Sequence, residues 1–306
     1  MNISLEFHDT LEKLGICPTG QVRKFNGCEE NGFPSSLDIE ITSACNGSCR
    51  MCFQRGIPRV NDAPVGIMKS SMDLMADAFD DVLFLGGEPM LYLERLIEMA
   101  KYAKEMGKKT YVTTNGSFLG DNEATCQLAR FFDGINISIH SGDLKVNESI
   151  TGVSLNKDEL KRAVAILSGK SLRINCVLQK DGVKNLDGVD EILRLVKEIN
   201  IKGIKFTELQ LTSGVVEEMK GKFVSLDEIF GTDFIDFLMG DKCEAQYESD
   251  GINFSLKRSC LATYLFSRIQ KPEVTSSRRS VYVLHADGSV GGWGENSGCH
   301  ECHRLH

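Results

Sequence analysis

No stretch of the 306-residue sequence approaches the roughly 20 consecutive apolar residues that a membrane-spanning helix needs. The first fifteen residues contain acidic side chains and no long apolar segment, so they do not resemble a secretory signal. Internal repeats and low-complexity tracts are also lacking. Membrane proteins, coiled coils, collagen-like proteins and disordered chains are therefore excluded, and hydrophobic residues, at 42% of the total, suffice for a large core.

Positive charge is not in excess. Lysine and arginine together number 35, against 43 aspartate and glutamate residues, which gives a formal net charge of −8. Proteins held on nucleic acid by phosphate contacts carry the opposite sign. We therefore expect no nucleic-acid partner and no membrane partner, although a local basic patch is compatible with this balance.

Cysteine is present in an unusual number. The 11 cysteines among 306 residues fall well below the ~8–10% of a small disulfide-stabilised scaffold, and their number is odd. Because no export signal is visible, disulfides are a poor explanation for them. We expect a reduced, cytoplasmic protein that uses thiolates as metal ligands.

Short β-type segments alternate with helical segments from residue 37 onward. Strands are predicted at 37–42, 81–86, 109–115, 134–140, 172–178 and 204–209. Helices are predicted at about 71–79, 91–106, 122–132, 157–168 and 188–199. Strands separated by helices favour a parallel sheet, either an open doubly wound sheet or a partial barrel. In both architectures the active site lies at the C-terminal ends of the strands.

This alternation stops after residue 210. A further helix is predicted at 225–239, and the Ala-Asp-Gly-Ser centre of residues 281–293 predicts a β-hairpin. We therefore expect a lead at 1–36, an α/β unit at 37–210 and a small C-terminal α+β extension at 211–306.

Three cysteines follow the first predicted strand in the sequence CNGSCRMC, with C-x3-C-x2-C spacing. A short loop with this spacing can aim three thiolates at neighbouring corners of one iron–sulfur cube, which four cysteines normally hold. A compact triplet therefore suggests one iron left open for another ligand. A zinc site, which would need a fourth Cys or His nearby, and chance spacing are the alternatives.

A second motif ends the second predicted strand, in the sequence LFLGGEP at 83–89. Two glycines allow the backbone to approach a ligand closely, and Glu88 supplies an acceptor at the edge of the sheet. Taken alone, this segment is more typical of a plain turn from a strand to a helix.

Together, CNGSCRMC at 45–52 and GGEP at 86–89 resemble the motifs of the radical S-adenosylmethionine (radical SAM) superfamily. The resemblance covers roughly 37–210 and implies an α/β fold, a partial (β/α)6 barrel of parallel strands. It implies a [4Fe–4S] cluster whose open iron binds SAM and whose ligands are Cys45, Cys49 and Cys52. One electron, from a flavodoxin- or ferredoxin-type donor, would cleave SAM to methionine and a 5′-deoxyadenosyl radical that abstracts hydrogen from the substrate.

The resemblance also implies contacts to SAM. Met51 would replace the aromatic residue that usually lies beside the adenine. The methionine amino group would meet the loop formed by Gly86, Gly87, Glu88 and Pro89. Further polar contacts would come from the ends of the third, fourth and fifth strands, at Thr114, Asn115, Ser138 and Asn175. Ordinary polar strand ends are the alternative for these four residues.

Four cysteines beyond the repeating unit form a second group, Cys243, Cys260, Cys299 and Cys302. They resemble the twitch and SPASM extensions of radical SAM enzymes, which bind an auxiliary iron–sulfur cluster. In that pattern the hairpin usually ends in a cysteine, where this sequence has Trp293, so a partial, single-cluster version is expected. A zinc site that uses the interleaved His300, His303 and His306, or cysteines that bind no metal, are the alternatives.

Two residues near predicted strand ends, His140 and Glu208, are candidate acid–base groups, and a structural role is the alternative for His140. The leading hypothesis is a radical SAM enzyme that dehydrogenates, epimerises, cross-links or rearranges a small molecule or short peptide. Alternatives are a peptide-maturing SPASM-type enzyme of a natural-product pathway and a viperin-like or GTP-cyclase-like nucleotide enzyme. A non-catalytic iron–sulfur or zinc protein is the alternative outside enzymology.

Overall fold

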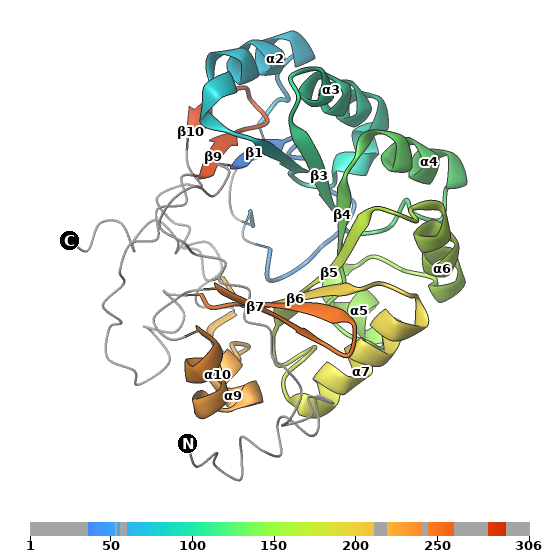
Figure 1. Ribbon diagram of the computed structural model, residues 1–306, viewed down its shortest axis with the longest axis vertical. Coiled ribbons are helices and arrows are strands. Elements are labelled where there is room, and N and C mark those ends of the chain that lie inside the picture. The colour runs from blue at the N-terminus through green and yellow to red at the C-terminus, as the bar shows by residue number, and fades with distance from the viewer. Residues whose placement is uncertain are drawn as a thin grey trace, which may run out of the picture.

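The computed structural model describes residues 36–52, 54–55, 60–210, 219–239, 244–259 and 281–291. Their strands form one ten-stranded sheet in the order β10-β9-β1-β2-β3-β4-β5-β6-β8-β7. The sheet curves into an open partial barrel with most helices on its outer side (Figure 1). This architecture confirms the predicted α/β fold class.

Six parallel strands form the centre of the sheet, as the alternating pattern predicts. They are β1 (Ser36–Glu40), β2 (Asp81–Leu85), β3 (Lys109–Thr114), β4 (Gly134–Ser138), β5 (Ser171–Leu178) and β6 (Gly203–Glu208). Each strand pairs in parallel with the next, so all six end at one edge of the sheet. The loops that carry the two motifs therefore leave neighbouring strands at the edge where barrels of this kind build their sites.

Helices separate the strands. They are α2 (Val65–Leu74), α3 (Leu93–Glu105), α4 (Asn122–Phe131), α5 (Leu144–Thr151), α6 (Lys157–Ile166) and α7 (Leu186–Glu198), with short 3₁₀ turns η1 (Ala76–Ala78) and η2 (Pro89–Tyr92). In α7, Val189, Ile192 and Val196 recur at helical spacing and are buried against the sheet. Among the helices that the structure describes, none has the length and apolar character to cross a lipid bilayer.

Three helices differ from the sequence prediction. The helix expected at 71–79 begins earlier, as α2, because Pro64 lies just ahead of its first turn, where a missing N–H costs nothing. Helix α5 was not predicted, since it has only eight residues and few apolar ones. The helix expected at 225–239 is divided into α9 (Leu226–Phe230) and α10 (Thr232–Met239) by Gly231, whose φ is +81°.

Strands from the C-terminal part lengthen the sheet at both ends. They are β7 (Glu244–Ser249), β8 (Ile252–Lys257), β9 (Val281–Leu284) and β10 (Val290–Gly291). β9 and β10 form the predicted hairpin. The sequence did not predict that β9 pairs in parallel with β1 and β8 in parallel with β6. The proposed boundaries 37–210 and 211–306 stay predictions.

The two faces of the sheet differ in composition. In β5, the core contains Ile174, Cys176 and Leu178, which face the helices. Arg173 and Asn175 alternate with them and are only partly buried, so they lie on the opposite face. We call this opposite face, which lines the inside of the curved sheet, the inner face.

Candidate active site

The loop after β1 carries the three cysteines of the first motif. Cys45, Cys49 and Cys52 are free thiols and partly buried. Burial, followed by the charges of Cys52 and Cys45, raises the pKa of Cys49 to about 12, and burial also raises the pKa of Cys52. The three thiols therefore lie close enough to influence one another's ionisation. A bound cationic metal centre would offset the cost of forming thiolates here.

These thiols do not converge on a single-ion site. Within the described ranges, no three His, Cys, Asp or Glu residues are grouped so as to hold one metal ion. A [4Fe–4S] cube binds each cysteine through a different iron, so it separates its ligands more widely than a tetrahedral zinc ion does. The donor set, three thiols and no histidine, fits the cube better than zinc.

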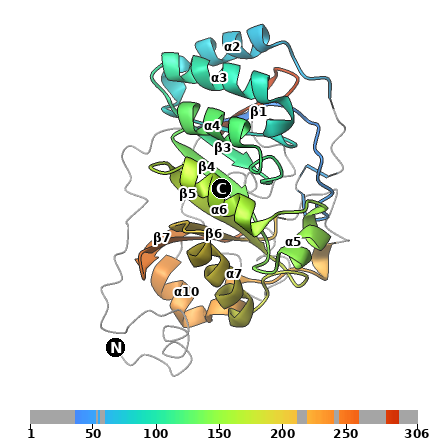
Figure 2. The same ribbon diagram turned by 90° about the vertical axis from the view of Figure 1, so that its right-hand side faces the viewer.

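Helix α5 fixes the middle of the cysteine loop. The carbonyl oxygen of Thr151, at the end of the helix, accepts from the Ser48 N–H at 2.7 Å and from the Cys49 thiol at 3.8 Å. The next residue, Gly152, has a φ of +70°, and a Cβ there would lie 2.3 Å from Ser48 Oγ. The left-handed φ and this close approach both favour glycine here. Figure 2 shows α5 beside the segment that follows β1.

The GGEP loop after β2 lies directly against the cysteine loop. The Gly87 N–H donates to Thr42 O at 2.7 Å, and the Glu88 N–H donates to Ala44 O at 2.8 Å. A Cβ on Gly86 would lie 2.4 Å from Thr42 O, and one on Gly87 would lie 1.9 Å from Ala44 O. Glycine is therefore required at both positions for the backbones of the two loops to come into contact. The sequence had predicted a different role for these glycines, which was to let the backbone approach a ligand.

Glu88 is buried and joins the ends of β2 and β3. Its carboxylate accepts from the Met90 N–H at 3.0 Å, from the Thr114 hydroxyl at 2.7 Å and from the Asn115 N–H at 2.7 Å. Burial raises the pKa of Glu88 above its usual value, although the three donors act in the opposite direction. Glu88 thus braces the GGEP and TTNG segments against each other.

An amide network connects the cysteine loop to the end of β3. The Asn115 side chain donates to Asn46 Oδ1 at 2.8 Å and accepts from the Ser117 N–H at 3.0 Å, while Asn46 donates to Ser117 Oγ at 3.0 Å. Asn115 was predicted from the sequence as a SAM contact, whereas no role was predicted for Asn46. The position of Asn46, immediately after the first cysteine, was the only signal that could have found it.

Comparison with known families decides the assignment of this edge. The model of the radical SAM superfamily matches residues 39–196, slightly more than half of the chain. This chain belongs to the radical SAM superfamily. Membership implies a [4Fe–4S] cluster that binds SAM. The region matched contains the cysteine loop, the GGEP loop and the ends of β3, β4 and β5.

Two curated relatives are each 30% identical to this chain over the residues that align. A S-adenosylmethionine-dependent nucleotide dehydratase of Fibrobacter sp. (strain UWH6) is 30% identical over 161 residues, which are 47% of this chain and 47% of that protein. A probable GTP 3′,8-cyclase of Sulfolobus acidocaldarius is 30% identical over 207 residues, 64% of this chain and 62% of the relative. The chain thus spans about half to three-fifths of the relatives' length.

Among solved structures, SuiB of Streptococcus suis bound to S-adenosylmethionine matches 84% of this chain and 60% of its own chain. The TM-score is 0.62 and the sequence identity is 19%, so the likeness shows the shared fold.

The remaining predicted SAM contacts lie on or beside the inner face. Met51 is buried in a small apolar cluster with Ile150 and Phe223. Ser138 and Asn175 are register partners in β4 and β5, and Asn175 Oδ1 accepts from Arg173 Nε at 3.1 Å. Their contacts with SAM stay predictions.

His140, just beyond β4, is buried. Its Nδ1 accepts from the Val177 N–H at 3.1 Å, which places the proton of the neutral ring on Nε2. Burial lowers its pKa to about 4. A neutral, hydrogen-bonded imidazole favours the structural alternative, and the acid–base role stays untested.

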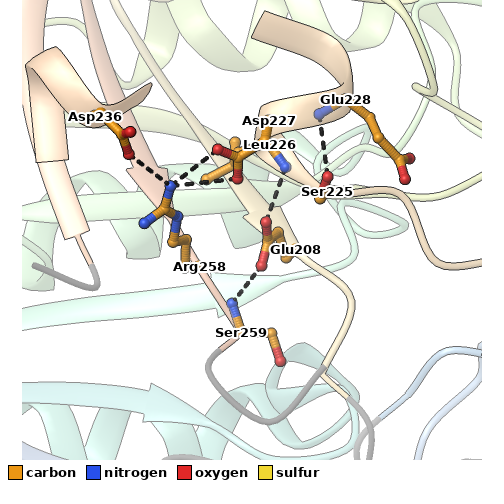
Figure 3. Close-up of polar contacts among 8 residues, drawn as sticks. All are labelled: Glu208, Ser225, Leu226, Asp227, Glu228, Asp236, Arg258 and Ser259. Carbon is orange, nitrogen blue, oxygen red and sulfur yellow. Dashed lines mark hydrogen bonds and ion pairs between the residues drawn. The ribbon is translucent and has the colours of Figure 1, made fainter. Parts of the chain in front are cut away.

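Glu208, at the end of β6, is fully buried. One oxygen accepts from the Leu226 N–H at 2.8 Å and the other from the Ser259 N–H at 2.8 Å (Figure 3). Beside it, Arg258 forms ion pairs with Asp227 at 3.1 Å and Asp236 at 3.6 Å. These contacts show Glu208 joining β6 to α9 and to the end of β8. Its acid–base role also stays a prediction.

The predicted auxiliary group lies outside the described residues. This holds for Cys243, Cys260, Cys299 and Cys302, and equally for Trp293 and the three C-terminal histidines. Ser259, which Glu208 binds, immediately precedes Cys260 in the sequence.

Proposed function

We propose that this chain cleaves SAM reductively at a [4Fe–4S] cluster held by Cys45, Cys49 and Cys52, and abstracts hydrogen from a small-molecule or short-peptide substrate. The observation that carries this proposal is the contact between the cysteine and GGEP loops, made by two backbone hydrogen bonds and two glycines that no other residue could replace. It supports a single site in which both motifs act together.

When bound, the reduced cluster supplies the electron that breaks the C5′–S bond of SAM, which leaves methionine and a 5′-deoxyadenosyl radical that takes a hydrogen atom from the substrate. The three cysteines would hold the cluster. Glu88 would act through the loop that it braces, because its carboxylate already accepts three hydrogen bonds. Ser138 and Asn175 would offer polar groups to the ribose or carboxylate of SAM.

Two classes of substrate, nucleotides and peptides, are supported to different degrees. A nucleotide substrate is supported by the two curated relatives, whose names specify a nucleotide dehydratase and a GTP cyclase. A peptide substrate is supported by the fold that the chain shares with SuiB. At a sequence identity of 19%, this likeness shows the shared fold alone. Oxidoreductase and lyase chemistry are both compatible with the site.

Anaerobic reconstitution tests the SAM reaction. With iron, sulfide and dithionite, the protein should form 5′-deoxyadenosine from SAM, as measured by chromatography. Cys49→Ala should abolish this product, because the cluster loses a ligand. Cys126→Ala is the matched control, since Cys126 is an exposed thiol on α4, away from the motif. A fully loaded cluster that yields no 5′-deoxyadenosine would contradict the proposal.

We also propose an auxiliary iron–sulfur cluster on Cys260, Cys299 and Cys302, with Cys243 as a fourth ligand. Iron analysis tests it, because one [4Fe–4S] cluster contributes about four iron atoms per chain and two contribute about eight. Cys302→Ala should lower the higher value to the lower one. Zinc in place of the additional iron would favour the alternative zinc site.

A further inference from the structure

Three cations lie together on the inner face of β5, β6 and β8. Lys205 on β6 is the register partner of Asn175 and of Ser255, and Lys257 lies two residues beyond Ser255 on β8. Arg173 lies two residues before Asn175 on β5. Since side chains two residues apart share a face, all three cations point to the same side of the sheet.

Of the carboxylates in the part of the chain that the structure describes, Glu244 lies among these cations. Glu244 Oε1 is 2.9 Å from Lys205 Nζ and 3.0 Å from Ser255 Oγ, and Glu244 is the cross-strand partner of Lys257. Its charge also acts on Arg173. The other carboxylate on this face of β7, Glu248, is exposed and lies four residues along the strand, roughly 13 Å from Glu244 at 3.3 Å per residue. Among the described residues, the three cations and Glu244 therefore sum to an excess of about two positive charges.

The burial of these side chains makes that excess costly. The Lys205 side chain is only 15% exposed. Burial, together with the charges of Lys257 and Arg173, lowers the pKa of Lys205 to about 8, while Glu244 acts in the opposite direction. Uncompensated positive charge in a partly buried site is a strong attractor for an anion.

We propose that Arg173, Lys205 and Lys257 form the subsite that binds a phosphate group of the substrate. An excess of about two positive charges matches one phosphate ester, which carries about −1.5 to −2 charges at neutral pH, better than it matches a single carboxylate. Arginine and lysine are also the side chains that bind phosphate oxygens most strongly.

The position of the subsite suits a small substrate. Lys205 is level with Asn175, a predicted SAM contact, and β8 lies two strands from β5, roughly 10 Å at ~4.8 Å per strand. A phosphate at the cations would thus lie about 10 Å from the side of the barrel where SAM is expected. This inference rests on the proposed function, because it assigns the substrate of the same site.

Calorimetry with the reconstituted, SAM-bound holoenzyme tests the subsite, with inorganic pyrophosphate as the probe. Lys257→Gln should weaken binding about 10-fold or more, since it removes one charge-assisted contact. Glu244→Gln should strengthen binding several-fold, because it removes the competing carboxylate. Lys202→Gln, an exposed lysine just ahead of β6, is the matched control and should leave binding unchanged. A folding defect would weaken binding in both site variants, so opposite signs identify the charge effect.

The same preparations are assayed for 5′-deoxyadenosine formed from SAM. Active protein that does not bind pyrophosphate, or that binds it equally in Lys257→Gln and Glu244→Gln, overturns the subsite and leaves the SAM reaction standing. Equal binding of tricarballylate, a polycarboxylate, overturns the assignment to phosphate. Protein that forms no 5′-deoxyadenosine contradicts the proposed function instead.

Discussion

The two sides of the barrel are built in different ways. At the ends of β1, β2 and β3, loops are joined through backbone atoms, and glycines stand where any Cβ would collide with a neighbouring carbonyl oxygen. At β5, β6, β8 and β7, the inner face is defined by side chains on regular strands, and Lys205 of β6 pairs there with Glu244 of β7. Loops joined by close backbone contacts tolerate few sequences, whereas a wall of side chains, such as the proposed phosphate subsite, can change one residue at a time.

The largest effect should come from breaking the backbone contact on the cofactor side. Gly87→Ala would place a Cβ 1.9 Å from Ala44 O, so the cysteine and GGEP loops must separate. We expect loss of cluster binding and of SAM cleavage, with a destabilisation of several kcal/mol. Iron content and 5′-deoxyadenosine formation measure the result.

Gly66→Ala is the control for that substitution. Gly66 lies in α2, and a Cβ there has no neighbour within 4 Å. This variant should retain full activity and gain up to about 1 kcal/mol, because alanine is the better helix former. Equal behaviour of the two alanine variants would show that the loops do not depend on close backbone contact.

The second prediction concerns β4, which lies between the two sides. Burial holds the pKa of His140 near 4, below the value of about 6.5 expected in the unfolded chain. The unfolded state therefore takes up the proton first, and the stability contribution, complete above pH 6.5, is lost as the pH falls through 4. The loss amounts to about 3 kcal/mol at most.

Urea unfolding between pH 7.5 and 4.5 measures this loss. The wild-type protein should lose stability faster on acidification than His140→Gln, which has no titrating ring at this position. Parallel pH profiles of the two proteins would mean that His140 is not buried in its neutral form.

Buried carboxylates at the two sides provide the third comparison. Glu208 ends β6, Glu88 lies in the loop that follows β2, and both accept backbone N–H groups. Replacement of either by glutamine leaves one buried donor unsatisfied and should cost about 1–3 kcal/mol. Only Glu88→Gln should also slow SAM cleavage, since Glu88 braces the cofactor loops.

Glu208→Gln should instead reduce iron bound beyond the first cluster, because Glu208 holds the residue just before Cys260. Kinetics and iron content distinguish the two variants. Glu208→Gln should leave SAM cleavage intact when no substrate is added. A strong loss of that cleavage would show that the Glu88 side and the Glu208 side of the barrel do not act independently.

The contrast between the sides also explains how much the sequence predicted. Alternating strands and helices have strong periodicity, so all six central strands were predicted at their observed places. The two motifs were identified by their resemblance to those of the superfamily, and the structure brings their loops into backbone contact at residues such as Gly87, while their contacts with the cofactor stay predictions. Lys205 and Glu244 lie 39 residues apart and meet only through the pairing of β6 with β8 and of β8 with β7, for which no local pattern exists. No local pattern predicted the role of α5 either, because that role depends on the loop that the helix contacts.

The smallest expected effect concerns Asn46, which connects the cofactor loops through exposed side chains. Asn46→Ala removes the hydrogen bonds to Asn115 and Ser117 and should cost about 0.5–1.5 kcal/mol. Since Glu88 still holds the Asn115 N–H, we expect a several-fold rise in the KM for SAM with little change in the maximal rate. Steady-state formation of 5′-deoxyadenosine measures both constants. A fall in the maximal rate at an unchanged KM would instead place Asn46 in the chemical step, and the network at this edge would then do more than position the cofactor loops.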